Sequence, residues 1–533
     1  MRISGRSIIG FQEGGTTGEV FRATRPWDGT QLLPDFVSAT FEEVTLAARL
    51  AHEAFATYGR CSGHDKGALL RKIAAKIESM ADQVIERAEQ ETALPKVRLQ
   101  GETARTCAQL RLFAQVVEEG SWTAARIDTA DPERKPIPKP DIRSMLRPIG
   151  PVVVFGASNF PLAFSVAGGD TASALAAGNP VIVKAHHSHP GTSEIVGRAV
   201  QESVRECGLP EGVFSLLFGS GTQVGTALAQ NPLVKAVGFT GSRRGGRALM
   251  YLAAARPEPI QVFAEMSSTN PVFILPGAMR ERGEQIAAGL HGSFTLGAGQ
   301  FCTKPGMVFF GDNADAVAFT EKLRQALPSV PQFTMLNAGI TSSYRSVLAS
   351  RKKDPAVRLL AETQPSAEFS VGAALFETDA TSFLANPVLA DEMFGPATQL
   401  VRYSNCAELM EIARSLEGHL TATIHGTEQD LREFPDLIAV LENKVGRVVF
   451  NGFPTGVEVC HAMVHGGPVP STSDGRSTSV GSQAIFRWVR PVCYQGFPDA
   501  VLSEELRDTN PLAIWRMVDG ELTRQPIGVP SGG

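Results

Sequence analysis

The sequence predicts an α/β protein built around a parallel sheet, and three observations support this fold class. The chain has 533 residues, which is too long for one hydrophobic core, so we expect two or three domains. After residue 143, short apolar runs alternate with helical segments, a pattern typical of parallel strands joined by helices. Glycine-rich loops follow several of these runs, where the expected strands end.

The composition argues against several classes of partner. Apolar residues make up 43% of the chain and charged residues 20%, as in an ordinary soluble protein. The net charge of −5 gives no reason to expect nucleic acid or a membrane surface as a partner, and no run approaches the ~18 apolar residues of a membrane span. The seven cysteines are scattered without a Cys-x-x-Cys pair. We therefore expect a cytoplasmic protein without disulfides or a zinc site.

Three segments precede the expected sheet. Residues 1–40 have the pattern of short strands and turns, whereas apolar residues recur with a helical period through 41–120. Residues 130–140 contain four prolines and cannot form a helix. This stretch is expected to be an exposed arm or strand.

Loops after the expected strands indicate a dinucleotide site. The apolar runs place four strands, at 151–155, 181–183, 213–218 and 234–239. An alanine- and glycine-rich helix should follow the first strand's loop and end at Ala177. The loops 219–225 and 241–246 open helices whose free amides can hold a pyrophosphate. Neither has the Gly-x-Gly-x-x-Gly pattern, so the prediction depends on the convergence of the strand ends at one crevice.

Cys302 is the candidate nucleophile. It follows the small residues Gly297, Ala298 and Gly299, which suit a backbone that another molecule approaches closely. Pro305-Gly306 then turns the chain away. A thiolate needs such access, and its tetrahedral product needs nearby donors. The alternative for an isolated cysteine is an inert buried thiol.

Several motifs together resemble the NAD(P)-dependent aldehyde dehydrogenase superfamily over residues 20 to 500. They are Phe155-Gly-Ala-Ser-Asn159-Phe-Pro161, Phe239-Thr-Gly-Ser242, Glu265, Gly297-x-x-Gln300-x-Cys302 and Asp391-Glu-Met-Phe-Gly-Pro396. A closer resemblance is to bacterial 2,5-dioxovalerate (α-ketoglutarate semialdehyde) dehydrogenases. It is carried by 168–175, 453–457, 463–467 and 490–494. Bacterial long-chain aldehyde dehydrogenases share part of this pattern.

The resemblance implies a catalytic role for three residues. Cys302 would attack the aldehyde carbon, and the side-chain amide of Asn159 with the backbone N–H of Cys302 would stabilise the oxyanion. Glu265 would activate the water that hydrolyses the thioester, and a raised pKa is expected for this carboxylate in an apolar crevice. The family usually continues after this glutamate with Leu-Gly-Gly-Lys, but here the sequence is Met266-Ser-Ser-Thr-Asn270.

The resemblance also implies a set of cofactor contacts. Lys184 would hold the adenosine ribose, Glu392 the nicotinamide ribose, and Phe394 would pack beside the nicotinamide. The full set is Phe155, Gly156, Ala157, Ser158, Lys184, His186, His187, Gly219, Gly221, Gly225, Phe239, Thr240, Gly241, Ser242, Arg243, Gly246, Met266, Glu392 and Phe394.

NADP is the expected cofactor, with NAD possible. His187 stands where many members of the family carry a glutamate that repels the 2′-phosphate. Arg243 and Arg244 are candidates for the phosphate, with plain surface charge as their alternative. His186, His187 and His189 do not predict a metal site, because adjacent side chains on an extended segment point apart and no Cys or Asp joins them.

The expected substrate is a small aldehyde with a distal acid group, 2,5-dioxopentanoate, oxidised to 2-oxoglutarate. Its tunnel would be lined by Phe160, Phe164, Phe301, Phe453 and Val457. Donors for the distal carboxylate are expected from Arg476, His461, Ser477 and Thr478, for which surface solvation is the alternative. A medium- or long-chain aldehyde enzyme would instead have an uncharged tunnel. Two other classes stay open, a thiol hydrolase that uses Cys302 with a histidine and a non-catalytic protein with the same fold.

The family fold has a Rossmann-type cofactor domain, an α/β catalytic domain and a small β oligomerisation flap. The expected boundaries are 1–128 and 149–263 with part of 455–485 for the cofactor domain, 264–454 for the catalytic domain, 129–148 and 486–500 for the flap, and 501–533 for a C-terminal extension. A two-stranded flap with a strand around 486–490 would gain stability by pairing with another subunit. We therefore expect a homodimer or homotetramer.

Overall fold

The first domain of the computed structural model, which describes residues 3–365 and 367–528, is organised around a seven-stranded sheet. The strand order is β11-β10-β7-β8-β9-β1-β2, and the first five are parallel. Their bounds are β7 Val152–Phe155, β8 Val181–Lys184, β9 Phe214–Leu217, β10 Ala236–Thr240 and β11 Gln261–Glu265. Two short antiparallel strands, β1 (Ile8–Ile9) and β2 (Gln12–Glu13), extend one edge. The predicted α/β class and the four predicted parallel strands are confirmed.

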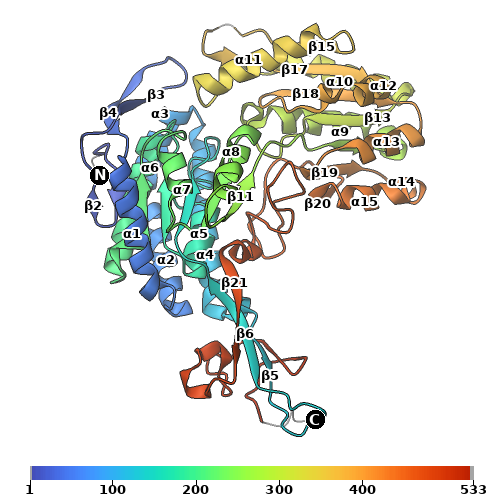
Figure 1. Cartoon of the computed structure of the whole chain (residues 1–533). Coiled ribbons are helices and arrows are strands. Elements are labelled where there is room, and N and C mark those ends of the chain that lie inside the picture. The colour runs from blue at the N-terminus through green and yellow to red at the C-terminus, as the bar shows by residue number, and fades with distance from the viewer. Residues whose placement is uncertain (1–2, 366, 529–533) are drawn as a thin grey trace.

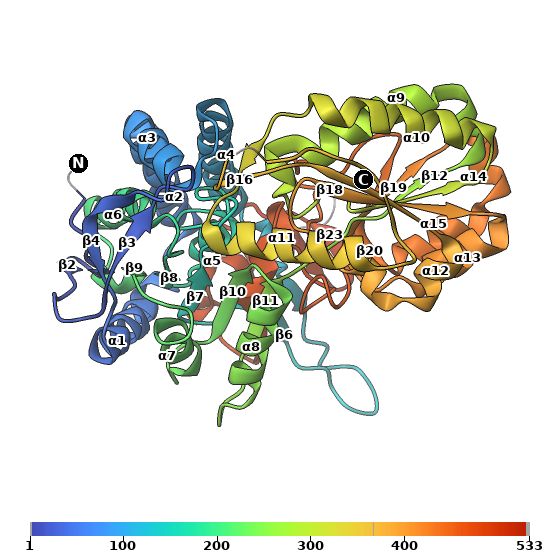
Figure 2. The ribbon, with the colours of Figure 1, turned by 90° about the horizontal axis from the view of Figure 1, so that it is seen from above.

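Helices cover both faces of this sheet, because successive side chains on a strand point to opposite faces. Val152 and Val154 pack with α2, α4, α5 and α6, whereas Val153 and Phe155 pack with α1, α7 and α8 (Figure 2). The helix bounds are α1 Phe41–Tyr58, α2 Gly63–Ser79, α3 Ala81–Thr92, α4 Lys96–Glu119, α5 Gly169–Ala177, α6 Pro190–Glu206, α7 Val224–Gln230 and α8 Arg243–Ala254. The predicted helical stretch 41–120 is thus four helices. The helix predicted to follow the 156–161 loop begins only at Gly169, after a run of turns.

The second domain has its own seven-stranded sheet, in the order β15-β17-β18-β13-β12-β19-β20. All neighbours are parallel except the edge strand β15. The strands are β12 Val272–Ile274, β13 Met307–Gly311, β15 Arg358–Glu362, β17 Ala374–Asp379, β18 Ala397–Tyr403, β19 His419–His425 and β20 Val445–Phe450. The helices are α9 Pro276–Thr295, α10 Ala314–Ala326, α11 Ala338–Lys353, α12 Ala380–Ala385, α13 Cys406–Ser415, α14 Glu428–Glu433 and α15 Pro435–Glu442. Val308 and Phe310 pack toward α9 and α10, and Phe309 packs toward α12 and α13.

A separate five-stranded sheet projects from the body of the molecule, as Figure 1 shows. Its order is β21-β6-β5-β22-β23. The strands are β5 Arg126–Asp128, β6 Ile142–Pro148, β21 Val489–Gln495, β22 Arg516–Val518 and β23 Glu521–Thr523. The predicted strand around 486–490 begins only at Val489, because residues 482–488 form a 3-10 helix that buries Trp488. This sheet is also larger than the predicted two-stranded flap, because the C-terminal segment adds β22 and β23.

Short elements complete the described chain. The hairpin β3 (Val20–Thr24) and β4 (Gln31–Val37) lies near the N-terminus, and β14 (Phe333–Thr334) pairs with β16 (Ser370–Val371). Among the described residues, no helix combines the length and the apolar content needed to cross a membrane.

Candidate active site

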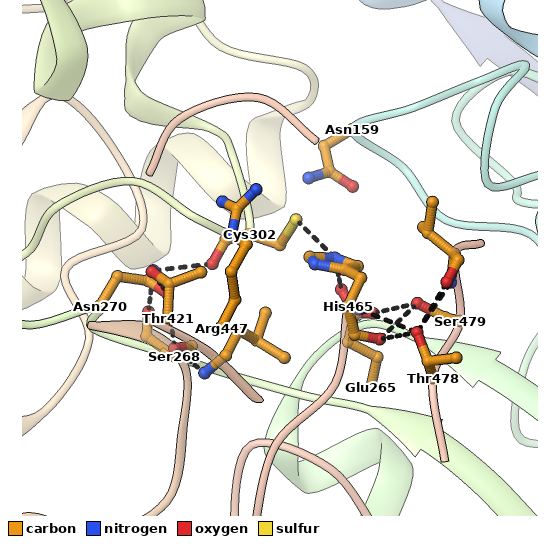
Figure 3. A network of polar contacts seen from close by, with 12 residues as sticks. Asn159, Glu265, Ser268, Asn270, Cys302, Thr421, Arg447, His465, Thr478 and Ser479 are labelled. Atoms are coloured by element: carbon orange, nitrogen blue, oxygen red, sulfur yellow. Dashed lines mark hydrogen bonds and ion pairs between the residues drawn. The ribbon is translucent and has the colours of Figure 1, made fainter. Parts of the chain in front are cut away.

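The candidate site lies where the first sheet faces the second domain. Glu265 ends β11, Asn159 follows β7, and Cys302 lies between η3 (Leu296–Gly299) and β13. His465 belongs to the long segment after β20, which returns to the first sheet and forms a bridge to Glu265 through Thr472. Figure 3 shows the side chains of Asn159, Cys302, His465 and Glu265 converging. The structure thus brings together the three residues for which the sequence predicted a catalytic role.

The turn before Cys302 uses left-handed backbone at three successive residues. Gly297, Ala298 and Gly299 have φ angles of 55°, 58° and 63°, which glycine adopts at little cost. A Cβ atom on Gly299 would lie 2.2 Å from the carbonyl oxygen of Gly395. A larger residue would therefore push the two loops apart. The sequence predicted that another molecule would approach these small residues closely. In the structure, the loop that contains Gly395 makes this close approach.

The unusual segment after Glu265 holds the nucleophile's backbone in place. The side-chain amide of Asn270 donates to the carbonyl oxygens of Cys302 at 2.8 Å and of Lys304 at 3.0 Å. Its own oxygen accepts from the hydroxyls of Ser268 and Thr421. Asn270 itself has a φ of 49°, a conformation that asparagine tolerates better than most residues. The loop without the family's two glycines is thus ordered by side-chain hydrogen bonds.

His465 connects the nucleophile with the carboxylate. Its Nε2 atom lies 3.4 Å from Sγ of Cys302 and 3.0 Å from Oε1 of Glu265. Glu265 and His465 are almost fully buried. Oε2 of Glu265 accepts a hydrogen bond of 2.9 Å from the hydroxyl of Ser479. Nε2 can therefore take the thiol proton, and the carboxylate beside it can stabilise the imidazolium that forms.

The expected raised pKa of Glu265 was wrong. Burial acts to raise this pKa, but the pairing with His465 and the hydrogen bond from Ser479 outweigh burial and hold it below its ordinary value. The sequence could not show these partners, because both come from a segment about 200 residues further along the chain. Glu265 is consequently an ionised proton acceptor at neutral pH.

Cys302 has the opposite shift. Burial and the nearby charge of Glu265 raise the pKa of the thiol well above its ordinary value, and the guanidinium of Arg105 acts to lower it. In the absence of substrate the thiol is therefore protonated at neutral pH. Forming the thiolate requires a base, and both His465 and the Glu265 carboxylate lie close to the sulfur.

Asn159 lies beside the nucleophile on the opposite side from Glu265. Its side-chain Nδ2 atom donates to the backbone carbonyl of Gln300 at 3.0 Å. The backbone carbonyl of Asn159 accepts a 2.6 Å hydrogen bond from Nη2 of Arg98. The carboxamide carries a second N–H on the same nitrogen. Asn159 can therefore stabilise an oxyanion without leaving its position.

Donor atoms of Glu265, Cys302 and His465 lie within 4.8 Å of one another. Such a set of sulfur, nitrogen and oxygen atoms is of the type that Zn²⁺ accepts. These atoms are already paired with one another in the described structure, and the absence of a metal stays a prediction.

Sequence reasoning missed three residues of the site: His465, Arg98 and Arg105. His465 lies in the 463–467 motif, which had been used for the resemblance but not for chemistry. The two arginines lie on α4, far from the recognised motifs in sequence. Their spacing of seven residues on a helix was a signal, since it places both on one face.

Aromatic side chains form one wall beside Cys302. Phe160 packs edge-to-face against Phe164 at 5.2 Å and against Phe301 at 5.5 Å between ring centroids. Val457 packs against the same cluster. Phe453 lies elsewhere, with its ring 4.9 Å from that of His425 and against Gly289 on α9. Four of the five expected tunnel residues therefore share one wall, and Phe453 does not.

The residues expected at the distal carboxylate have other partners. The Arg476 side chain is 88% exposed and pairs with Asp474, and His461 is exposed. Ser477 donates to the carbonyl of Asp474. The Thr478 hydroxyl is buried between the backbone groups of His465 and Val480. The structure does not gather these four side chains into a subsite.

The strand ends of the first sheet form the expected cofactor region. Phe155 and Phe239 pack edge-to-face at 6.0 Å, over the loops that contain the remaining glycines. Gly225 lies against Phe155, and Gly246 lets Met266 pack onto α8, since a Cβ there would be 2.6 Å from the methionine sulfur. Ser242 caps α8 by accepting from the amide of Gly245. The predicted loop residues thus lie around one edge of the sheet.

Lys184 fits a role toward an anionic or hydroxyl-rich ligand. Its side chain is buried at the end of β8, and burial lowers its pKa to about 8. Within the described residues its ammonium group has no hydrogen bond or ion pair. An ammonium group in this position is costly without a partner, so the residues present fit a dinucleotide at this edge.

The histidines after Lys184 stack on one another. The ring centroid of His186 lies 4.5 Å from that of His187 and 5.4 Å from that of His189. His189 is buried and bonds the carbonyl of Ala157, in the loop that carries Ser158. Burial and the neighbouring histidines hold the pKa of His186 well below its ordinary value. The cluster is therefore neutral at pH 7 and presents no carboxylate.

Arg243 is not free. Its guanidinium forms an ion pair with Glu417 of the second domain, at 2.9 Å. Arg244 is exposed on the same turn of α8. The structure therefore uses Arg243 to connect the domains, and only Arg244 is left as an unengaged candidate from this pair.

Glu392 lies beside the segment that follows Glu265. Burial raises its pKa, against the opposing effects of Lys304 and of hydrogen bonds from Ser267 and Ser268. Lys304 is buried beneath this turn and donates to the carbonyls of Met393 and Ala397. Phe394 is half-buried on the same turn. This turn lies against the loop before Cys302, where Gly395 approaches Gly299.

Fold and site together define a two-domain α/β protein in which a cysteine, a histidine and a glutamate meet beside the strand ends of the first sheet. Comparison with known proteins places it more closely: the chain belongs to the aldehyde dehydrogenase family, whose model, described as "Aldehyde dehydrogenase family", matches residues 12–488. It is therefore an enzyme that acts on an aldehyde group.

Two relatives match nearly the whole chain. Alpha-ketoglutaric semialdehyde dehydrogenase 2 of Azospirillum brasilense is 50% identical over 98% of this chain and 100% of its own length. Alpha-ketoglutaric semialdehyde dehydrogenase of Acinetobacter baylyi is 47% identical over 92% of this chain and 93% of its own.

Solved structures share the fold at lower identity. The NADP-dependent glyceraldehyde-3-phosphate dehydrogenase of Bacillus halodurans, complexed with NADP, has a TM-score of 0.78 at 20% identity, covering 92% of this chain and 98% of its own. Lactaldehyde dehydrogenase of Escherichia coli has a TM-score of 0.80 at 20% identity, covering the same shares of the two chains.

Proposed function

We propose that this enzyme oxidises 2,5-dioxopentanoate to 2-oxoglutarate, with NADP as its preferred cofactor. The observation that carries the substrate is the 50% and 47% identity to two alpha-ketoglutaric semialdehyde dehydrogenases over most of the chain. The site supports the same reaction type, because it joins a nucleophilic thiol, oxyanion donors and a carboxylate. NADP is supported by the carboxylate-free histidine segment after Lys184.

The first step would use the contacts of His465 with Cys302 and Glu265. Nε2 of His465 takes the thiol proton, the Glu265 carboxylate stays ionised and stabilises the imidazolium that forms, and the thiolate attacks the aldehyde carbon. The Asn159 amide and the backbone N–H of Cys302 stabilise the oxyanion, and losing one such donor typically costs about 3 kcal/mol of transition-state energy. This step needs a base because the thiol has a high pKa.

The bound nicotinamide supplies the hydride acceptor. Lys184, the amides that open α8, and Glu392 are the groups that would hold the dinucleotide. On the side of the protein, loss of hydride leaves the acyl group as a thioester on Cys302. Glu265 is ionised and can take a proton from water, and the product carboxylate is then released.

The projecting sheet is the basis for a proposal on assembly. The projecting five-stranded sheet has β21 at one edge, and an exposed strand edge is stabilised by pairing with another chain. We propose a homodimer or homotetramer formed through this sheet.

A cytoplasmic location is supported by the seven cysteines, all of which are free.

The deciding experiment compares kcat/KM for 2,5-dioxopentanoate, propanal and decanal. The proposal predicts the highest value for the semialdehyde. If decanal exceeds it by more than about tenfold, equivalent to ~1.4 kcal/mol of transition-state preference, the site is built for alkyl chains instead. The same assay with NADP and NAD tests the cofactor, and a strong preference for NAD would reject that part.

A further inference from the structure

Two arginines on α4 lie beside the active-site wall with donors that the chain does not use. Nη1 of Arg98 and both Nε and Nη2 of Arg105 are buried and lack a hydrogen-bond partner among the described residues. A buried donor on a charged group is expensive to leave unpaired. Three such donors side by side indicate a place for an acceptor that comes from outside the chain.

The free donors of Arg105 have the geometry of a carboxylate clamp. Nε and Nη2 lie on the same edge of the guanidinium, which binds both oxygens of a carboxylate through parallel hydrogen bonds. Within the described residues Arg105 forms no ion pair and no hydrogen bond. By contrast Arg111, further along α4, is exposed and paired with Glu78 at 2.5 Å. The unpaired state is therefore particular to the inward face of the helix.

Aromatic rings hold the two guanidinium groups next to the nucleophile. Arg98 lies over Phe301 at 4.6 Å and over Phe160 at 4.9 Å from the ring centroids. Arg105 lies over Phe164 at 5.2 Å. Phe301 directly precedes Cys302 in the chain. Cation–π contacts of this kind fix the position of the charge while leaving its edge donors free.

Neighbouring acids do not fill the free donors. Oε2 of Glu102 forms an ion pair with Nη2 of Arg98 at 3.9 Å but accepts no hydrogen bond within the described residues, and Oε1 accepts from the amides of Leu162 and Ala163. Glu458 influences Arg105 only electrostatically and is exposed. Nη1 of Arg98 and Nε and Nη2 of Arg105 therefore stay unpaired within the described residues, and an anionic substrate group could pair with them.

We propose that Arg105 and Arg98 form the subsite that binds the acid end of the substrate. This inference rests on the proposed function and assigns the distal recognition that Arg476 and its neighbours do not provide. Arg105 binds the carboxylate through Nε and Nη2, and Nη1 of Arg98 donates to the adjacent 2-oxo oxygen. Because Nη2 of Arg98 also donates to the carbonyl of Asn159, the subsite is joined directly to the oxyanion residue.

The test uses two aldehydes of equal chain length that differ by the acid group, 5-oxopentanoate and pentanal. In Arg105→Leu, kcat/KM for 5-oxopentanoate should fall by about 10- to 100-fold, the usual size of a lost charged hydrogen bond. The value for pentanal should fall much less, because pentanal has no acid group and loses only the effect of Arg105 on the Cys302 thiol. Arg111→Leu, on the same helix, is the matched control and should change neither value.

A second readout does not depend on turnover of an acid substrate. Glutarate should inhibit pentanal oxidation competitively in the wild type, and this inhibition should weaken by a similar factor in Arg105→Leu. The mutation leaves no hydrogen-bond partner of Arg105 unpaired among the described residues. The variant should therefore keep the wild-type melting temperature. If it fails to fold, Arg105→Lys retains the charge without the fork and should lose part of the discrimination.

The outcomes separate this inference from the proposed function. If wild-type enzyme prefers pentanal to 5-oxopentanoate, the proposed function itself is wrong. If wild type prefers 5-oxopentanoate and Arg105→Leu keeps that preference, the function stands and the arginine subsite is rejected. Equal losses on both aldehydes would mean that Arg105 acts on the Cys302 thiol, whose pKa it lowers, and would also reject the subsite.

Discussion

Nε2 of His465 lies 3.4 Å from Sγ of Cys302, and the same nitrogen lies 3.0 Å from Oε1 of Glu265. Cys302 and Glu265 therefore share one imidazole nitrogen. This arrangement couples their charges: the ionised Glu265 raises the pKa of the Cys302 thiol, and His465 offsets the effect of burial on Glu265. A change at Glu265 should therefore alter the pKa of the Cys302 thiol, and a change at His465 should alter the pKa of Glu265.

His465→Ala should shift the acid side of the pH–rate profile. Without His465, burial is no longer opposed by its principal partner, so the pKa of Glu265 should rise and the carboxylate should be lost at a higher pH than in the wild type. The acid limb of kcat should therefore move to higher pH, and kcat/KM should fall about 10²-fold or more from loss of a general base. His52→Ala, at an exposed position on α1, is the control. An unchanged acid limb would show that His465 does not influence Glu265.

Glu265→Gln should make Cys302 more reactive toward alkylation while blocking turnover. Removing the negative charge lowers the pKa of the thiol, so the pH midpoint of iodoacetamide labelling at Cys302 should move to lower pH. Deacylation should stop, and mass spectrometry should find an acyl adduct on Cys302 after one addition of aldehyde and cofactor. Normal steady-state turnover in this variant would mean that another base hydrolyses the thioester.

Cys302→Ala should abolish aldehyde oxidation without loss of dinucleotide binding. The mutation removes the atom that forms the covalent bond, whereas Lys184 and the loops at the end of the first sheet are unchanged. Quenching of tryptophan fluorescence by NADPH, or calorimetry with NADP, measures the binding. Residual oxidation above the uncatalysed rate would contradict the covalent mechanism.

Asn270→Ala should weaken both stability and the positioning of the nucleophile. The carbonyls of Cys302 and Lys304 would lose their donor, and each buried carbonyl left unpaired costs about 1–3 kcal/mol. Asn270→Gly keeps the left-handed backbone without strain, so a loss shared by both variants reports the hydrogen bonds. Urea unfolding and the rate of Cys302 labelling are the measurements.

A control separates global from local effects at Asn270. Asn405 caps α13 by accepting from the amide of Glu408, far in sequence from the site, and Asn405→Ala should cost about 1 kcal/mol of stability. It should leave the labelling rate of Cys302 unchanged. If Asn270→Ala behaves in the same way, Asn270 is structural only.

Light scattering should give the mass of a dimer or tetramer at micromolar concentration. The reason is the exposed edge of β21 in the projecting sheet, whose backbone donors and acceptors another subunit can pair. The mass should not change with salt, since main-chain pairing is insensitive to ionic screening. A monomer mass would contradict the proposed assembly.

The local pattern of the chain determined much of this protein. The apolar runs at 151–155 and 181–183 could be read as buried parallel strands because a strand covered on both faces needs a continuous apolar run, which is a local pattern. Cys302, Glu265 and Asn159 could be placed by ordered motifs that resemble one family. Such features can be read from the sequence because each motif lies within one short, continuous strand-to-loop junction.

Only the tertiary structure decided the electrostatics and the partners. His465 and Ser479 reach Glu265 from a segment about 200 residues away, and they reverse the pKa shift that burial alone would cause. Arg98 and Arg105 became candidates because the fold leaves their donors buried and unpaired, whereas Arg243 and Arg476 were found to be engaged with acids. A residue's type states which charge or donor it carries. What that group faces depends on contacts between distant segments, and those contacts exist only once the chain has folded.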